Sequence, residues 1–141
     1  MLGVDPGERR LGFAVSDPDR VVAPPHSTVE LPAGCALARI AAEIAAVASA
    51  ADVTTVVIGL PRTPSGRDGR AAQRSRALAV AVEQRTGLVV QLWDERHTTA
   101  EAHRRMLEQG ASRGSRRAAL DRLAATLILQ SYLDAERARS T

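Results

Sequence analysis

Lysine is absent from this 141-residue sequence, and all 19 of its basic residues are arginine. A coding bias toward arginine and alanine is the simplest explanation of that absence. Arginine also suits phosphate groups, because its planar guanidinium donates two parallel hydrogen bonds. The formal net charge is only +3, so the total charge alone identifies no partner.

Cysteine, aromatic residues and long apolar runs are also scarce. The single cysteine, Cys35, excludes a disulfide framework and a thiolate metal cluster, so we expect a reducing, cytoplasmic location. No apolar run approaches the roughly 20 residues of a membrane span, and we expect no membrane partner. Aromatic residues make up only 2% of the chain, so aliphatic side chains must fill the core. The length predicts a single domain over residues 1–141.

The first 31 residues predict three strands, over 2–4, 11–17 and 21–31. Residues 11–17 alternate apolar with small or polar side chains, and the sequence DPDR at 17–20 is typical of a tight turn. Sequential strands with short connections form an antiparallel meander. The strand over 2–4 must pair with this meander, and we expect it to be central in the sheet.

The rest of the chain alternates helical and strand patterns. Because a strand–helix–strand unit forces a parallel, right-handed crossover, two further strands extend the meander into a mixed five-stranded sheet. This α/β arrangement with flanking helices is the plan of an RNase H-like domain. The predicted strands are 53–60 and 88–93; the predicted helices are 35–52, 70–86, 98–110 and 116–137, the last with an apolar face of Leu120, Leu123, Ala124, Leu127 and Ser131.

Four acidic residues stand at the ends of these elements. Asp5 ends the first strand, Asp94 and Glu95 follow the strand over 88–93, and Asp121 lies in the first predicted turn of the last helix. Active sites of such folds lie at the carboxyl ends of the strands, where these side chains could meet. Each acid also has a plain structural explanation, as a turn former, a partner of Arg96 or a helix N-terminal charge.

Convergence of these acids would favour phosphodiester hydrolysis. Gathered carboxylates repel one another unless a cation lies between them, and ligands that are all oxygen suit Mg²⁺ or Mn²⁺. Two such ions can activate water and stabilise the leaving oxygen of a phosphodiester. The three histidines, His26, His97 and His103, have no metal-ligand spacing.

Residues 104–117 hold five arginines against one glutamate. Such a basic stretch is typical of contact with a nucleic-acid backbone, although on this feature alone a solvated loop is the favoured explanation.

Four stretches together resemble the YqgF/RuvX-like family, whose members are described as pre-16S rRNA nucleases or Holliday junction resolvases. The resemblance covers nearly the whole chain. Its motifs are GVDPGERRLGFAVSDP, VVIGLPRTPSGRDG, WDERHTTAEA and LDRLAATLILQSYLD, in that order.

The resemblance implies an RNase H-like nuclease that uses Mg²⁺ or Mn²⁺ to mature the 5′ end of pre-16S rRNA. It implies an acidic triad of Asp5, Glu95 and Asp121, with Asp94 as an uncertain fourth ligand. It also implies that a set of arginines faces the nucleic acid: Arg10, Arg96, Arg113, Arg116 and Arg117.

Several alternatives stay open on the sequence. The substrate could be branched DNA rather than an rRNA precursor, and the chain could act as a monomer or as a homodimer. A nucleic-acid-binding module without catalysis would need mainly the arginines. The motif D-x-G-x-x-x-x-G also occurs in sugar kinases and actin-like ATPases, but those proteins need two lobes and this chain has the length of one.

Overall fold

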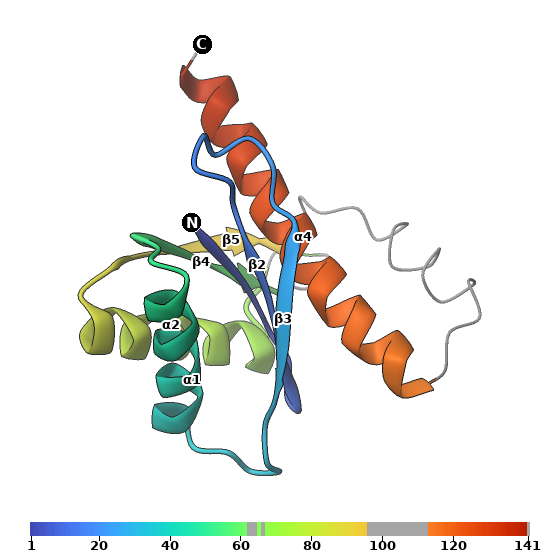
Figure 1. The fold of residues 1–141 in the computed structure, drawn as a ribbon. Coiled ribbons are helices and arrows are strands. Elements are labelled where there is room, and N and C mark those ends of the chain that lie inside the picture. Colours follow the sequence, from blue (N-terminus) through green and yellow to red (C-terminus); the bar gives the residue numbers. More distant parts are fainter. Residues whose placement is uncertain (62–64, 66, 96–112, 141) are drawn as a thin grey trace.

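The structure is a computed structural model that describes residues 1–61, 65, 67–95 and 113–140, with the backbone alone for 113–119. The helix expected over 98–110 lies outside these residues. The described elements, shown in Figure 1, are β1 (Leu2–Pro6), β2 (Arg10–Val15), β3 (Pro25–Glu30), α1 (Leu37–Ala50), β4 (Thr55–Leu60), α2 (Arg70–Thr86), β5 (Val89–Asp94) and α4 (Arg113–Ser140).

The strands form one five-stranded sheet in the order β3-β2-β1-β4-β5. β1 pairs antiparallel with β2, and β2 pairs antiparallel with β3. β4 is parallel to both β1 and β5. The predicted meander with two added parallel strands is therefore confirmed, and β1 is the central strand.

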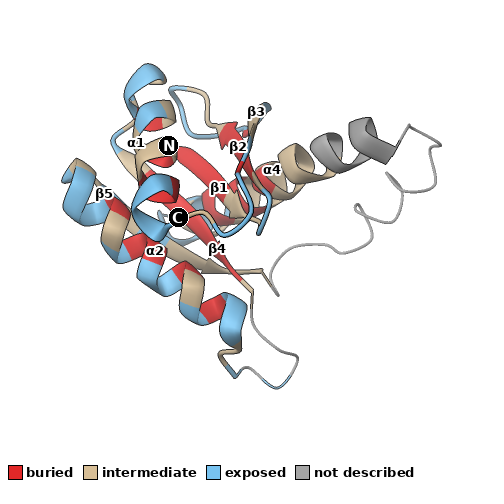
Figure 2. Ribbon diagram, turned by 90° about the horizontal axis from the view of Figure 1, so that it is seen from below, coloured by how far each residue is buried: buried red, intermediate tan, exposed pale blue. Residues whose placement is uncertain are grey.

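Helices cover both faces of the sheet. Leu2 and Val4 are fully buried in a core that includes Ile40 and Ile44 of α1 and Leu78 of α2. Because side chains alternate along a strand, the residues between them face the other way, toward α4. Figure 2 shows the buried residues concentrated along β1, β2 and β4, between the helical layers. Each fully buried aliphatic side chain contributes about 1.5–3 kcal/mol to this three-layer arrangement.

α4 differs from the predicted last helix in its start and in its buried face. It begins at Arg113 rather than at residue 116, so the prediction of a loop is wrong for residues 113–115. Asp121 consequently lies in the third turn, too far from the helix start to be explained by the helix dipole. The predicted face is only half-buried. The residues that are buried are Ala125, Ile128, Leu129, Tyr132 and Leu133.

The segment after β2 also differs from the prediction, because the strand expected over 21–31 begins only at Pro25. The Asp17 carboxylate accepts hydrogen bonds from the backbone N–H groups of Val21 and Val22, at 2.7 and 2.9 Å. These bonds lower the pKa of Asp17. They hold residues 17–22 in an extended turn, which leaves residues 21–24 outside the ladder.

Gln130 of α4 fixes this turn against the helix. Its side-chain carbonyl accepts a hydrogen bond from the buried Ala23 N–H at 3.0 Å, and its amide donates to the Val21 carbonyl at 2.8 Å. The amide also donates to the Asp134 carboxylate at 2.9 Å. One side chain thus satisfies two backbone groups of a loop distant in sequence.

Gln130→Ala should lower the free energy of unfolding by about 1–3 kcal/mol, because it leaves the buried Ala23 N–H without its partner. Urea unfolding followed by circular dichroism measures this loss. Arg137→Ala removes only the exposed contact with Asp134, and it should change stability by less than about 0.5 kcal/mol. Equal losses in the two variants would contradict the role of Gln130.

α2 ends where the sequence predicts. Gly87 has a φ of 71°, a left-handed conformation that favours glycine, and its N–H donates to the Glu83 carbonyl at 2.8 Å. Of the helices described, none combines the length and the apolar character needed to cross a bilayer.

Candidate active site

Asp5 lies inside the central strand rather than in a turn. β1 continues through Asp5 to Pro6, and Asp5 is paired in register with Gly12 of β2. The turn expected from the sequence DPG begins only after the carboxylate. Because Val4 belongs to the core on the α1 and α2 side, Asp5 faces α4. The half-buried carboxyl group is therefore held by the most constrained strand of the sheet.

Gly12 brings Asp121 close to Asp5. A Cβ atom at Gly12 would lie 2.0 Å from the Asp121 backbone oxygen, so only glycine allows α4 to approach β2 at this point. Gly3 plays the same part further along α4, where a Cβ would lie 2.7 Å from the Leu129 Cβ. Glycines inside strands are typical of such close approaches. They explain why the Ala125–Leu129 face of α4, rather than the adjacent apolar face, packs on the sheet.

Gly59 of β4 makes room for Glu95. A Cβ at Gly59 would lie 2.5 Å from the Glu95 Oε1 and 2.6 Å from the Ile128 Cδ1. The Glu95 carboxylate therefore lies over β4 on the face that α4 covers, which is the face of Asp5. Glu95 follows directly after β5, as the sequence indicates.

Asp94 lies on the other side of β5. The neighbouring Trp93 contacts α4, where its indole N–H donates to the Ser131 hydroxyl at 2.9 Å and its ring packs edge-on against Tyr132. Alternation along β5 then directs Asp94 away from α4. The structure places Glu95 on the face of Asp5, whereas Asp94, although its charge reaches Glu95, points to the opposite face.

The carboxyl groups influence one another electrostatically. Burial, then the charge of Glu95, then that of Asp121 raise the pKa of Asp5 from 3.8 to about 7. Burial, followed by the charge of Asp94, raises the pKa of Glu95. The charges of Glu95 and Asp121 thus both reach Asp5, and burial affects Asp5 and Glu95.

Arg10 places a positive charge beside Asp121. Its Nε lies 3.7 Å from the Asp121 Oδ2, and both side chains are largely shielded, with 18% and 26% of their surface exposed. The arginine thus lies at the carboxylate region, where its guanidinium could also reach a phosphate. Arg96 lies outside the described residues, and so do the side chains of Arg113, Arg116 and Arg117.

The donor set fits a hard divalent cation in its chemistry. Carboxylate oxygens are the ligands that Mg²⁺ and Mn²⁺ prefer, and a cation would relieve the repulsion that, after burial, raises the pKa of Asp5. The fit is incomplete in geometry: over the described ranges no three Asp, Glu, His or Cys side chains lie close enough to enclose an ion. Ion binding would therefore have to draw the carboxylates closer together.

Sequence reasoning missed the three glycines and one arginine of α2. The signal for the glycines was their position in strand interiors, which indicates close packing of another backbone. No local signal indicates Arg74, whose Nη2 donates to the Gly7 carbonyl at 2.9 Å.

Comparison with known proteins identifies the family. The family model described as "RuvX: Holliday junction resolvase" matches residues 1–135. A relative from Nocardioides sp. is 47% identical over 139 residues, which are 97% of this chain and 88% of the relative. A Lachnospira eligens relative is 38% identical over 136 residues, with 96% and 97% covered. A Mycobacterium tuberculosis relative is 42% identical over 135 residues, with 94% and 77% covered. All three carry the description "Putative pre-16S rRNA nuclease".

Among solved structures, Thermus thermophilus RuvC is similar with a TM-score of 0.61 and 14% identity, over 97% of this chain and 95% of that one. The same protein in complex with a Holliday junction substrate gives a TM-score of 0.60 at 16% identity, with 96% and 94% covered. At such low identity the likeness concerns the fold, and it confirms the RNase H-like arrangement. The family model and the relatives, which match nearly the whole chain, identify its family: this chain belongs to the RuvX family.

Proposed function

We propose that this protein is a divalent-metal-dependent nuclease that hydrolyses phosphodiester bonds of structured nucleic acid, most specifically at the 5′ end of pre-16S rRNA. One observation carries the proposal. Asp5, Glu95 and Asp121 come from three separate parts of the chain and face α4's side of the sheet, where burial, then the charges of Glu95 and Asp121, raise the pKa of Asp5. A domain that only bound nucleic acid would have no use for carboxylates that repel one another, because they would also repel phosphate groups.

In this proposal Asp5, Glu95 and Asp121 hold the metal. A bound Mg²⁺ or Mn²⁺ supplies Lewis-acid chemistry, which activates water and stabilises the leaving oxygen. Asp5 must lose its proton to bind a cation, so metal binding releases protons near neutral pH. Arg10 would donate to a phosphate oxygen beside Asp121, and the backbone of β1 and β2 keeps these groups in fixed positions.

The relatives favour an rRNA precursor over branched DNA. The relatives that are 38–47% identical are named for pre-16S rRNA, whereas the RuvC structures are only 14–16% identical. The description of the family model keeps Holliday junctions as the second candidate substrate. Both substrates occur in the bacterial cytoplasm, so the proposal places the protein there, as a monomer or a homodimer. Arg96, Arg113, Arg116 and Arg117 remain proposed contacts with the nucleic acid.

Glu95→Gln compared with Asp94→Asn tests the assignment of the carboxylates. Both changes remove one negative charge, but only Glu95 lies on the face of Asp5. We expect Glu95→Gln to lower Mn²⁺-dependent cleavage by about 10²-fold or more. Asp94→Asn should retain cleavage within about threefold, because Asp94 is directed to the opposite face.

The assay uses a pre-16S 5′ fragment, a four-way DNA junction and a DNA duplex of equal length, each with Mg²⁺, Mn²⁺ or EDTA. Cleavage of none of these substrates with either ion would reject the proposal. Preference for the four-way junction would replace rRNA by branched DNA. A larger loss in Asp94→Asn than in Glu95→Gln would overturn the assignment of Glu95.

A further inference from the structure

Arg74 of α2 fixes the turn that joins β1 to β2. Its Nη2 donates to the Gly7 carbonyl at 2.9 Å, although α2 covers the face of the sheet opposite to α4. The turn is also closed from within, because the Gly7 N–H donates to the Arg10 carbonyl at 3.0 Å. A Cβ at Gly7 would lie 2.6 Å from that same carbonyl oxygen. The turn is therefore tight, and the hydrogen bond from Arg74 to the Gly7 carbonyl connects it to α2.

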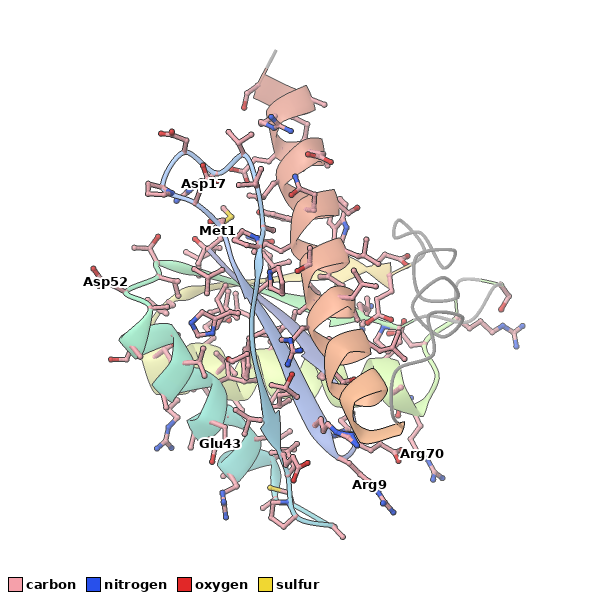
Figure 3. All side chains as sticks on the ribbon, turned by 45° about the vertical axis from the view of Figure 1, so that its right-hand side comes forward. Met1, Arg9, Asp17, Glu43, Asp52 and Arg70 are labelled. Carbon is pink, nitrogen blue, oxygen red and sulfur yellow. The ribbon has the colours of Figure 1, made fainter. Side chains whose placement is uncertain are left out.

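This contact brings two further arginines to the same corner of the molecule. Arg70 lies four residues before Arg74 and hence on the same side of α2, and Arg9 lies two residues after Gly7. Both side chains are exposed, and Figure 3 shows them projecting outward from this corner. We call Arg9, Arg70 and Arg74 the turn–α2 arginine surface.

The charge of this surface is strongly positive. Asp68, the acid nearest in sequence to the start of α2, is bound to Arg76. Glu8 adds one negative charge in the turn itself. The turn–α2 arginine surface thus carries three positive charges, with the single negative charge of Glu8 beside them.

The β1–β2 turn links this surface to the strands that carry Asp5 and Arg10. The turn starts where β1 ends, immediately after Asp5, and it leads into Arg10, whose Nε lies 3.7 Å from Asp121. The predicted basic contacts at residues 113–117 belong to α4, on the other face of the sheet. A nucleic acid bound at the carboxylates on the α4 face would have to extend around the β1–β2 turn to reach the turn–α2 arginine surface.

We propose that the turn–α2 arginine surface binds the phosphate backbone of the nucleic acid next to the scissile bond, and that Arg74 is the positioning residue that holds the turn for it. This inference rests on the proposed function and adds a binding surface to it. A guanidinium has five N–H donors, so the bond from Arg74 to Gly7 is compatible with a further bond to a phosphate.

Salt dependence of binding tests the surface without any need for cleavage. The probe is a fluorescent RNA hairpin with a single-stranded extension, titrated by anisotropy in EDTA from 50 to 300 mM NaCl. All variants carry Asp5→Asn. Each phosphate contact contributes about 0.7–0.9 to the slope of log K against log salt. Arg9→Ala with Arg70→Ala should therefore reduce the slope by about 1.5 and weaken binding about tenfold or more.

Arg39→Ala with Arg85→Ala is the matched control, because it removes the same charge from α1 and from the last turn of α2. It should leave the slope nearly unchanged. Equal slopes for the two double variants would overturn the proposed surface. A wild-type protein that cleaves nothing, together with a reduced slope in Arg9→Ala with Arg70→Ala, would reject the nuclease function and keep the surface.

The positioning role of Arg74 needs a different readout. Arg9→Ala with Arg70→Ala should raise KM more than it lowers kcat, since both residues only bind the substrate. Arg74→Ala should lower kcat about tenfold as well, because the turn between Asp5 and Arg10 loses its hydrogen bond to α2. Arg74→Lys keeps a charge and a donor and should restore most of kcat. A kcat in Arg74→Ala equal to that of the double variant would overturn the positioning role.

Discussion

Asp5→Asn is expected to abolish metal-dependent cleavage and, at the same time, to stabilise the metal-free protein. The loss of cleavage should reach about 10³-fold or more, because the central carboxylate of the proposed metal site is replaced by a neutral amide. The gain in stability follows from the same position. The wild-type carboxylate is desolvated and lies in the field of Glu95 and Asp121, and the amide carries no charge to be repelled.

The pH dependence of this gain has a definite sign. The pKa of Asp5 is about 7 in the folded protein against an ordinary value of 3.8, so between these values the folded state binds more protons than the unfolded state. The free energy of unfolding of the wild type therefore falls as the pH rises from about 4 to about 7. The difference in pKa corresponds to a loss of about 2–4 kcal/mol. Asp5→Asn lacks this loss, so its advantage should be absent at pH 4 and complete at pH 8.

Urea unfolding in EDTA between pH 4 and pH 8 measures both profiles. Asp19→Asn, in the exposed turn after β2, is the matched control and should follow the wild type. Adding Mn²⁺ at pH 8 should raise the melting temperature of the wild type and leave that of Asp5→Asn almost unchanged. Parallel pH profiles for the wild type and Asp5→Asn would show that Asp5 ionises without cost, against the burial described.

Gly12→Ala should have the largest effect on stability among single methyl additions in the described chain. The new Cβ would lie 2.0 Å from the Asp121 oxygen and 2.5 Å from its carbonyl carbon, both backbone atoms that cannot rotate away. α4 must therefore shift away from β2. We expect a loss of about 3 kcal/mol in the free energy of unfolding. Cleavage should fall about 10²-fold, because the shift moves the Asp121 carboxylate away from Asp5.

Gly3→Ala separates the loss of stability from the loss of the site. Its Cβ would contact the Leu129 side chain at 2.7 Å, on the same helix but two turns beyond Asp121. Gly3→Ala should therefore destabilise the protein while retaining more cleavage than Gly12→Ala at a temperature well below both unfolding transitions. Thermal melts and initial cleavage rates measure the two effects. Equal losses of cleavage would show that the position of α4 over Gly12 has no special importance.

The sheet could be predicted from the sequence because its signals are local and consistent. Short apolar runs separated by turns gave the meander, and β-branched runs between helical patterns gave the parallel strands. The face of α4 could not be predicted in this way. Two adjacent apolar faces are present on the helix, and the glycines of distant strands decide which one packs on the sheet.

The positions of the candidate acids along the chain could be predicted from the sequence, but their directions in the fold could not. Asp5 and Glu95 stand at strand ends, which is a general position for functional residues in such folds. The distinction between Glu95 and Asp94 required the side chain of Trp93, whose contact with α4 sets the alternation of β5. The turn in which Asp121 lies depends on where α4 begins, and residues 113–117 resemble a polar loop in sequence.

The proposed catalytic carboxylates also have a consequence for biosynthesis. Asp5 belongs to β1 and Asp121 to α4, so two segments synthesised at different times must meet before the proposed metal site can form. A nascent chain on the ribosome carries Asp5 long before it carries Asp121, and so it would lack the proposed site. If the substrate is a ribosomal RNA precursor, the proposed activity would appear only after α4 has left the ribosome and docked on the sheet.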